Sequence, residues 1–337
     1  MVTLKMLAKT CGVSVATVSK ALNGAPDISA ETAARIQKVA SDMGYIPCAA
    51  ARYLKTSHTN NIGVIFDDGT NSGLTHEHFA HILESFKRRS EEQGYDITFI
   101  SDQPGPWGSD FVTHVRYRNC DGVAVLVADN AAAAVQEFVR SGVPVISLDY
   151  HFENCSCIES DNVGGIRQLV QYIYDQGHRR IGAIFGEDTP VTRVRMSAFF
   201  HTCAQLGLEI PEDYVISSVF HESNAAAMAT RQLMALPEPP TCILYPDDFS
   251  FLGGMQELES MGKSIPKDVS ATGFDGISLG KVLRPQLTTI QQDTEAIGTA
   301  AADELIRAIK EGRGYIPKTV VIPTTLLPGG TVAKIEE

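Results

Sequence analysis

From residue 62 onward the chain alternates short apolar segments with amphipathic ones, and this alternation restricts the fold more than any other feature. Residues 62–66 (IGVIF) have the pattern of a buried strand, and residues 76–93 have that of an amphipathic helix. Further strands are predicted at 96–101, 122–127, 143–148, 180–185, 241–245, 269–274 and 319–322, and further helices at 110–118, 131–140, 164–176, 191–206, 225–234, 249–261 and 294–311. Strands that alternate with helices predict βαβ units, parallel sheets and right-handed crossovers.

A shift in composition near residues 159–162 divides this region into two parts of similar design. We therefore predict an α/β core made of two doubly wound, parallel-sheet lobes. Ligands of open parallel sheets bind beyond the carboxyl ends of the strands. Two facing lobes thus predict one ligand-binding cleft between them.

Residues 3–24 (TLKMLAKTCGVSVATVSKALNG) have a different pattern, which predicts two short helices joined by a tight turn. Apolar residues recur at helical spacing up to Cys11, Gly12 interrupts them, and Ser14 is placed to cap a second helix at 15–22. This arrangement is a helix-turn-helix, whose second helix lies in the DNA major groove. A short helical hairpin that packs as ordinary core is the alternative.

The outer face of that second helix carries side chains suited to DNA. They are Val15, Ala16, Ser19 and Lys20. Small, donor-bearing or cationic side chains match base edges, thymine methyl groups and phosphates. A third helix is predicted at 30–43, and three helices in about 45 residues have the size of an all-α DNA-binding headpiece.

Charge is distributed unevenly along the chain. Residues 1–60 contain seven lysine and arginine residues against three acidic ones, a net charge of +4. The overall charge is −12, so the other 277 residues carry −16. A basic head on an acidic body attracts phosphates at one end and repels DNA elsewhere. The asymmetry favours DNA binding by the N-terminal region.

Length and composition limit the class of protein. A chain of 337 residues, 44% of them hydrophobic, has room for two or three globular domains. No run approaches the roughly 18 apolar residues of a membrane span, and the N-terminus lacks the apolar core of a signal peptide. Seven cysteines without a CxxC motif fit a reducing compartment, so a cytoplasmic location is expected.

Two groups of residues resemble partial metal sites, and for both we favour an interpretation without a metal. One is Cys155 with Cys157, and the other consists of His76, Glu77, His78 and His81. Nothing near the cysteines in the sequence completes a metal site, and the histidines occupy a predicted helix start, which favours a surface or a cleft rim. The chain lacks GxxxxGK[ST], HExxH, GxSxG and a GxGxxG after a strand, so neither an enzyme nor a cofactor is expected.

Taken in order, several stretches resemble the lac repressor/galactose repressor family of bacterial transcription regulators. They are residues 3–24, 45–47 (YIP), 49–55 (AAARYLK), 120–123 (CDGV), 142–145 (GVPV), 160–162 (SDN), 177–182 (GHRRIG), 273–275 (GFD) and 285–290 (PQLTTI). The resemblance covers essentially the whole chain. It implies a ligand-responsive regulator, usually a repressor of a carbohydrate-utilisation operon, that binds a palindromic operator as a homodimer.

The resemblance implies roles for individual residues of the DNA-binding part. Val15, Ala16 and Lys20 would read bases, whereas Ser14, Thr17, Ser19, Asn23 and Tyr45 would contact phosphates. Residues 48–55 match a hinge that folds into a helix on operator DNA. In that hinge Leu54 enters the central base step from the minor groove, with Ala51 and Arg52 beside it. Cys48 replaces an Asn that is common at its position.

In the cleft, the resemblance assigns effector contacts to six residues. They are Asp149, Arg195, Phe199, His221, Asp247 and Asp275. Carboxylates accept hydrogen bonds from hydroxyls, arginine donates in a planar fork, and an aromatic ring covers an apolar ring face. This chemistry predicts a sugar or a sugar derivative as the effector. Asp247 occupies a position where an amide is frequent, and the match around His221 is loose.

The resemblance also divides the chain. It implies a headpiece at 1–46, a hinge and linker at 47–60, an N-lobe at 61–160 to which about 291–320 returns, and a C-lobe at 161–290 joined by about 321–331. Two alternatives to a small-molecule-responsive regulator stay open. One is a regulator controlled by a protein co-effector of the phosphocarrier type, and the other is a solute-binding protein without a DNA function.

Overall fold

The computed structural model describes residues 2–22, 24–45, 58–67, 73–101, 103, 105–106, 108, 110–127 and 132–335. The chain forms two compact units, residues 1–59 and residues 60–337, which are described separately. The predicted contacts of Asn23, Ala51, Arg52 and Leu54, with most of the predicted hinge, fall outside the described residues.

The first unit is a headpiece of three helices. They are α1 (Leu4–Cys11), α2 (Val15–Leu22) and α3 (Ala30–Asp42). The Thr3 side chain caps α1, and Gly12 ends it in the left-handed conformation at φ 65°. Ser14 Oγ accepts a hydrogen bond from the backbone N–H of Thr17 at 3.0 Å, which caps α2 as predicted. The apolar faces of all three helices meet in one small core that contains Leu7, Val18 and Ile36.

The N-lobe of the second unit is built on a six-stranded sheet in the order β11-β5-β4-β3-β1-β2. Its strands are β1 (Asn61–Asp67), β2 (Asp96–Ile100), β3 (Gly122–Val127), β4 (Val145–Leu148), β5 (Ser156–Ser160) and β11 (Thr319–Ile322). All neighbours pair in parallel. The strands are short and apolar because both faces of the sheet are covered by helices.

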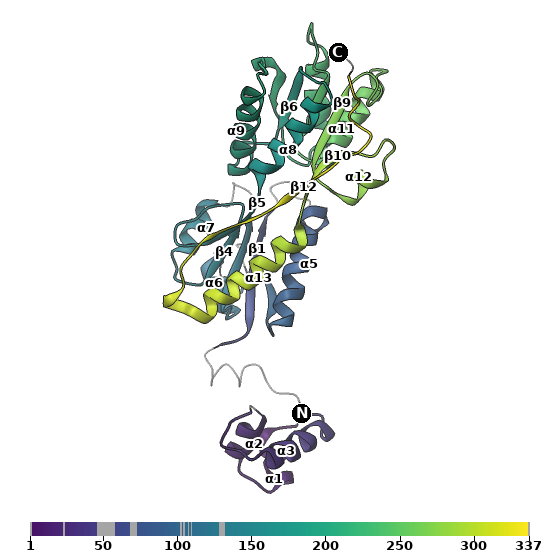
Figure 1. Cartoon of the computed structure of the whole chain (residues 1–337). Coiled ribbons are helices and arrows are strands. Elements are labelled where there is room, and N and C mark those ends of the chain that lie inside the picture. Colours follow the sequence, from purple (N-terminus) through teal and green to yellow (C-terminus); the bar gives the residue numbers. More distant parts are fainter. Residues whose placement is uncertain are drawn as a thin grey trace. The chain divides into compact units, whose positions relative to one another are not determined.

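Helices α5 (Glu77–Glu92) and α13 (Thr294–Glu311) cover one face of this sheet, and α6 (Phe111–Tyr117) and α7 (Ala132–Val139) cover the other. Helix α13 lies along α5 although about 200 residues separate them (Figure 1). The close approach depends on Gly298, where a Cβ would lie 2.1 Å from Ser85 Oγ.

The C-lobe repeats the design with the strand order β12-β10-β9-β8-β6-β7. Its strands are β6 (Ile181–Phe185), β7 (Val215–Ser217), β8 (Cys242–Leu244), β9 (Ser270–Asp275), β10 (Thr288–Gln292) and β12 (Thr324–Leu327), and its helices are α8 (Asn162–Asp175), α9 (Pro190–Gln205), α10 (Ser223–Met234), α11 (Asp248–Ser260) and α12 (Ser278–Val282). Only β12 runs antiparallel, against β10. Helices α8 and α9 cover one face, and α10 and α11 cover the other. Short 3₁₀ turns lie at Gly73–Thr75, Glu212–Tyr214 and Gly312–Gly314.

Three segments connect the lobes, because the chain passes from β5 to α8, from β10 to α13 and from β11 to β12. Hydrogen bonds join these segments to one another. Asp161 N donates to Ile322 O at 2.8 Å, and Ser160 Oγ donates to Oε1 of Gln292. The lobes are therefore joined by a bonded three-segment hinge rather than by independent linkers.

The predicted fold class is confirmed: an α-helical headpiece precedes two parallel-sheet lobes. The sequence pattern missed β5, β7, β10 and β12. Three of these four belong to the segments that connect the lobes. No helix in the described part of the chain is both long and apolar enough to cross a membrane.

Candidate functional site

A cavity of about 140 Å³ lies between the two lobes, and its polar lining follows strand ends in both sheets. Asp149 comes directly after β4, and Glu187 comes shortly after β6. Asp247 follows β8 by three residues, and Asp275 ends β9. The cavity thus occupies the place where parallel sheets bind ligands, at the carboxyl edges of both lobes.

Among the described residues of this lining, Arg195 on α9 is the single arginine or lysine, and it is 6% exposed. Its Nε donates to Asn162 Oδ1 at 2.8 Å, and its Nη1 donates to the carbonyl of Pro246 at 3.1 Å. The guanidinium also lies over the ring of Phe274, 3.6 Å from its centroid. Burial lowers the pKa of Arg195, whereas the carboxylates around it raise that pKa. The two hydrogen bonds and the contact with Phe274 hold the planar guanidinium in one orientation before any ligand binds.

Asp247 lines the cavity and also has a structural role. Its Oδ1 accepts from the N–H of Ser250 at 2.7 Å and so caps α11. Its Oδ2 accepts from the backbone N–H of His221 at 2.9 Å. The carboxylate thereby ties the start of α11 to the segment before α10, and it needs an acceptor oxygen at both places.

Asp275 connects the cavity to the hinge. Gln292, the last residue of β10, donates from Nε2 to Asp275 Oδ1 at 2.6 Å, and its Oε1 accepts from Ser160 in the first connecting segment. Burial raises the pKa of Asp275 well above its usual range, although the guanidinium of Arg195 acts in the opposite direction. A ligand that contacts Asp275 would thus act on a side chain bonded to the hinge.

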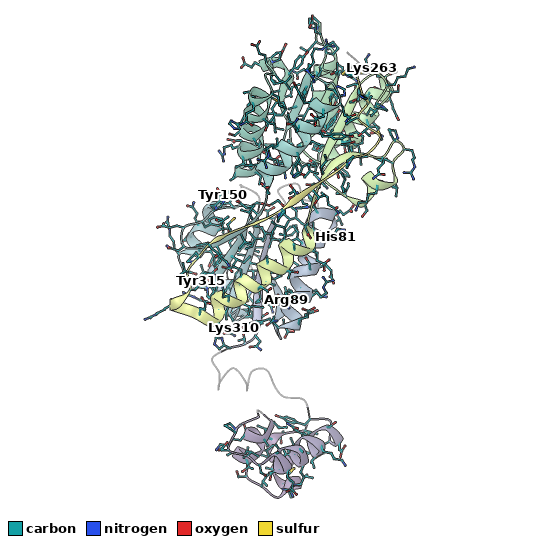
Figure 2. The ribbon with its side chains drawn as sticks, viewed as in Figure 1. His81, Arg89, Tyr150, Lys263, Lys310 and Tyr315 are labelled. Carbon is teal, nitrogen blue, oxygen red and sulfur yellow. The ribbon has the colours of Figure 1, made fainter. Side chains whose placement is uncertain are left out.

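Asp149 is the N-lobe counterpart of these C-lobe carboxylates. Its backbone is left-handed, with φ 56°, and its N–H donates to Ile158 O across the β4–β5 pair at 3.0 Å. Burial raises the pKa of its carboxyl to about 6, although Arg195 lowers it. Tyr150 follows it and lines the same cavity, at the end of the N-lobe that faces the C-lobe (Figure 2).

Three imidazoles also line the cavity, and two of them form a contact between the lobes. His76 precedes α5 in the N-lobe and stacks on His221 of the C-lobe, with ring centroids 3.7 Å apart and 16° between planes. His221 stacks in turn on Phe249 at 4.5 Å. Burial, followed by the charges of His76 and Arg195, lowers the pKa of His78 to about 3. The His78 imidazole, which lines the cavity, is therefore neutral at physiological pH.

The structure brings five of the six predicted effector residues to this one cavity. They are Asp149, Arg195, His221, Asp247 and Asp275. The sixth, Phe199, does not line it. Phe199 lies one helical turn beyond Arg195 on α9, is fully buried in the C-lobe core, and packs edge-on against Phe185. Apolar residues that do line the cavity include Phe79 and Phe220, which the sequence reasoning did not select.

Several lining residues were missed or interpreted differently from the sequence. Glu187, Thr189 and Gln292 were missed. Glu187 and Thr189 follow the predicted strand β6, which is the signal that could have found them, whereas Gln292 ends β10, a strand that the sequence pattern did not predict. His76 and His78 were noted as a surface or a cleft rim, and both are 7% exposed and line the cavity.

On the headpiece, the proposed base-reading side chains lie on an open face. Val15, Ala16 and Lys20 are exposed on α2, whereas Thr17 and Ser19 are half-buried. Ser14 and Thr17 bond each other at the start of the helix. Lys20 forms an ion pair with Asp27, and Tyr45 packs against the headpiece core. Lys20 would have to leave Asp27 in order to contact DNA.

Comparison with known proteins matches a family model to a part of each unit. Residues 3–48 match the family described as bacterial regulatory proteins, lacI family, and residues 170–332 match the periplasmic binding protein-like domain. The chain belongs to the lacI family.

Curated relatives of this lacI-family chain resemble it over nearly the full length. The HTH-type transcriptional repressor PurR of Vibrio campbellii is 27% identical over 318 residues, which cover 92% of this chain and 93% of PurR. The HTH-type transcriptional repressor CytR of Escherichia coli is 29% identical over 304 residues, 89% of this chain and 87% of CytR. The chain is accordingly a helix-turn-helix transcription regulator, and a solute-binding protein without a DNA function is set aside.

Solved structures share the fold of this lacI-family chain. The lac repressor dimer bound to operator and the anti-inducer ONPF superposes with a TM-score of 0.81 at 22% identity, covering 98% of this chain and 99% of that one. The regulator CelR in complex with cellobiose gives a TM-score of 0.70 at 24% identity, covering 98% and 100%.

Proposed function

We propose that this lacI-family regulator is a homodimeric repressor of a carbohydrate-utilisation operon, and that it binds its effector in the cavity between the lobes. The observation that carries the proposal is the convergence of buried polar groups from both sheets on one cavity at the strand ends. CelR, a relative of the same fold, has been solved with cellobiose, and the lac repressor has been solved as an operator-bound dimer.

The charges of the lining favour a neutral, hydroxyl-rich effector. Among the described residues, four carboxyl groups and one guanidinium line the cavity, and that guanidinium already donates to Asn162 and Pro246. Carboxylates accept hydrogen bonds from sugar hydroxyls, whereas an acidic or phosphorylated sugar would add negative charge to a lining that already has an excess. Stacked imidazoles and Phe220 can cover the apolar face of a sugar ring.

The hinge supports a mechanism for the response. Asp275 is bonded through Gln292 to Ser160, so an effector hydroxyl on Asp275 acts on two of the three connecting segments. We infer that the effector changes the equilibrium between lobe orientations and thereby the affinity for operator DNA. A coupling of roughly 1–3 kcal/mol between the two sites would be enough for a useful switch.

For DNA recognition we propose base contacts by Val15, Ala16 and Lys20 and phosphate contacts by five residues. Those five are Ser14, Thr17, Ser19, Asn23 and Tyr45. Their support is the position of the first three on the exposed face of α2 and the match of residues 3–48 to the family. Leu54, with Ala51 and Arg52, is proposed as the minor-groove element of the hinge.

A thermal-shift screen tests the effector assignment directly. The purified full-length protein is mixed with a matched panel of neutral sugars, the corresponding sugar acids and sugar phosphates, and nucleosides. A neutral sugar at about 100 times its Kd should stabilise the core by about 2.7 kcal/mol, which raises its melting temperature by a few degrees. Asp149→Asn should weaken this shift, and Asp188→Asn at an exposed carboxylate serves as the matched control.

Two results would overturn the assignment. Preferential stabilisation by the acidic sugars would contradict the charge argument. Absence of any shift, in protein that still binds palindromic DNA, would favour control by a protein co-effector instead.

The DNA assignment is tested with specific and random duplexes compared at one salt concentration. Leu54→Ala should reduce binding to the palindromic operator much more than binding to random DNA, because insertion into a base step contributes only at the specific site. Equal losses on both duplexes would remove Leu54 from that role.

A further inference from the structure

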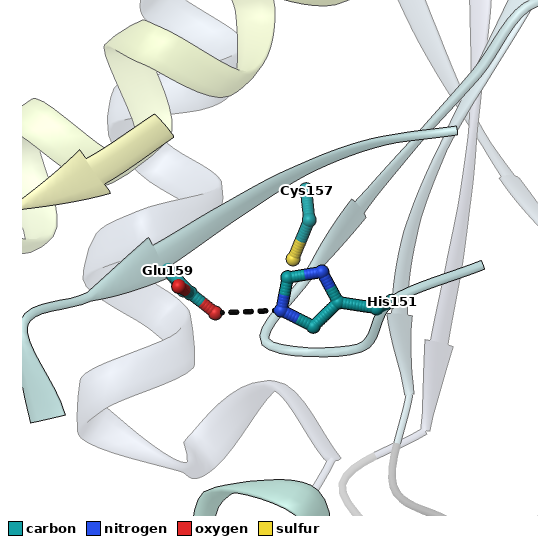
Figure 3. Close-up of side chains that lie close together, drawn as sticks. All are labelled: His151, Cys157 and Glu159. Carbon is teal, nitrogen blue, oxygen red and sulfur yellow. Dashed lines mark hydrogen bonds and ion pairs between the residues drawn. The ribbon is translucent and has the colours of Figure 1, made fainter. Parts of the chain in front are cut away.

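Cys157, Glu159 and His151 form a side-chain cluster outside the cavity (Figure 3). One potential ligand atom from each residue lies within 4.8 Å of the other two. In the described part of the chain, this is the one group of three histidine, cysteine or acidic residues with that spacing. We propose that this cluster is a binding site for a zinc-like transition-metal ion.

The strand geometry explains how two of these residues come together. Cys157 and Glu159 are two apart on β5, so both side chains lie on the same face of the sheet. Ile158 between them points into the opposite core, against α5 and α13. The sequence pattern did not predict this strand, and it paired Cys157 only with Cys155.

The turn between β4 and β5 supplies the third residue. Its backbone is left-handed at Asp149 (φ 56°) and at Asn154 (φ 60°), which folds the turn back over β5. His151 in this turn contacts Glu159, with Nε2 2.9 Å from Oε2 (Figure 3). The sulfur of Cys157 lies beside the same imidazole (Figure 3).

The donor set selects the class of metal. One thiolate, one imidazole and one carboxylate are ligands of Zn²⁺, and catalytic or exchangeable zinc sites have three protein ligands with water in the fourth position. Thiolate ligation disfavours Mg²⁺ and Ca²⁺, which take oxygen ligands. In a tetrahedral site with bonds of about 2.0–2.3 Å, donor atoms are about 3.5 Å apart, so the cluster must contract by about 1 Å.

Exposure allows both that contraction and the entry of an ion. The His151 side chain is 56% exposed and that of Glu159 is 26% exposed, so both can rotate, whereas Cys157 is buried at the base of the site. Burial, followed by the carboxylates of Asp149 and Glu159, raises the pKa of the Cys157 thiol. Binding forms a metal–sulfur bond and breaks the S–H bond of Cys157, and the proton goes to solvent.

Such an ion would restrain the turn that carries Asp149 and Tyr150, two residues of the cavity. The metal would then affect effector binding, a consequence that rests on the function proposed above. The metal site itself does not depend on that function.

Cobalt substitution tests the site in the full-length protein. After chelation and reduction, one equivalent of Co²⁺ should produce a thiolate-to-cobalt charge-transfer absorption and the visible bands of four-coordinate cobalt, and Zn²⁺ should abolish both. His151→Gln, Glu159→Gln and Cys157→Ser should each weaken Co²⁺ binding by at least about tenfold, since even second-shell changes at metal sites cost about 10–100-fold.

Matched controls separate a site from a general effect. Cys203→Ser changes another buried thiol, in the C-lobe core, and His201→Gln changes another exposed histidine. Both should keep the wild-type spectrum. His151→Gln carries the test if Cys157→Ser fails to fold, because His151 is exposed.

The proposal is overturned if the wild-type protein shows no sulfur–cobalt absorption. It is also overturned if His151→Gln binds Co²⁺ as tightly as the wild type, or if Cys203→Ser removes the absorption and Cys157→Ser does not.

Discussion

The two walls of the cavity are built in different ways. In the C-lobe wall, Arg195, Asp247 and Asp275 each have hydrogen-bond partners before a ligand arrives, in Asn162, Ser250 and Gln292. In the N-lobe wall, Asp149 and Tyr150 lie in a turn, and the Asp149 carboxylate accepts a backbone hydrogen bond from Ser160. Nδ1 of His78 in the same wall is buried without a hydrogen-bond partner among the described residues.

This difference assigns separate tasks to the lobes. A wall whose polar groups already have hydrogen-bond partners is preorganised, so its side chains lose little conformational entropy when a ligand binds. A wall with a buried nitrogen that lacks a partner gains a new hydrogen bond when a ligand supplies one. We infer that the C-lobe sets the orientation of the effector and that the N-lobe responds to it. The following predictions test this division.

The largest effect is expected for Arg195→Ala. Removing the guanidinium leaves Asp275, Asp149 and Asp247 without the buried cation that faces them, and leaves Asn162 Oδ1 without its donor. Loss of one partner from a buried charge cluster costs about 3–5 kcal/mol, so denaturant unfolding should show a reduction of that size. Arg193→Ala, at an exposed arginine on the same helix, should change stability by less than about 0.5 kcal/mol. A similar small change at Arg195 would contradict a preorganised C-lobe wall.

Two substitutions of Asp247 distinguish its role as a helix cap from the role of its charge. Asp247→Ala removes the N-cap of α11 and the acceptor of His221 N–H, and should reduce the free energy of unfolding by about 1–2 kcal/mol. Asp247→Asn retains one acceptor oxygen for the cap and should cost less, while it changes which sugars are bound. Equal destabilisation by both variants would show that the cap is not the main contribution of Asp247 to folding, and that the second acceptor oxygen or the negative charge is needed.

Asp149 should make effector binding depend on pH. Its pKa of about 6 means that the carboxylate takes up a proton between pH 7.5 and pH 5, and a ligand whose hydroxyl donates to the charged form should bind about tenfold more weakly at pH 5. Isothermal titration with the sugar found in the screen would measure this change. Asp149→Asn should remove most of the pH dependence, and an unchanged profile would mean that another group titrates.

The raised pKa of Asp149 also predicts the direction in which the stability of the protein changes with pH. The pKa of Asp149 is raised in the folded protein, so its contribution to stability is fully present below the unfolded pKa, near 4, and is lost as the pH rises through about 6. At pH 7.5 the Asp149→Asn variant should therefore be more stable than the wild type, and its advantage should shrink toward pH 4. Chemical denaturation at both pH values measures it.

The smallest effect concerns the contact between the lobes. The stack of His76 on His221 should contribute about 0.5–1.5 kcal/mol, as aromatic pairs do. A double-mutant cycle with His76→Leu and His221→Leu measures this coupling from the free energies of unfolding. Zero coupling would mean that the stack does not stabilise the observed arrangement of the lobes.

Local sequence signals were sufficient for most of the elements. Thr3, Ser14 and Ser29 cap the three headpiece helices because a side-chain oxygen can satisfy an N–H three residues ahead without help from the rest of the chain. The apolar strands of both sheets and the long helices α5 and α13 were likewise recognisable, since buried faces impose periodicity on the sequence.

There is a physical reason why the sequence pattern did not predict the missed strands. Strand β10 (TTIQQ) is mostly polar, yet Thr289 is buried because it donates to Asp248 Oδ1 at 2.5 Å, and Gln292 is buried because it bonds both Asp275 and Ser160. Polar residues satisfied by partners far along the chain have no local hydrophobic signature. Phe199 shows the converse: it shares a helix face with Arg195, but depth in the core, not spacing, excludes it from the cavity.

The sequence by itself determined the helix-turn-helix, the Ser14 cap of its second helix, the two-lobed α/β class and the basic head on an acidic body, because these depend on local spacing and composition. The tertiary structure alone decided how the connecting strands bond in the hinge, which imidazoles meet across the cavity, and that His151 reaches Cys157 and Glu159. These contacts form between segments whose proximity depends on strand order and turn geometry, and no local pattern encodes either.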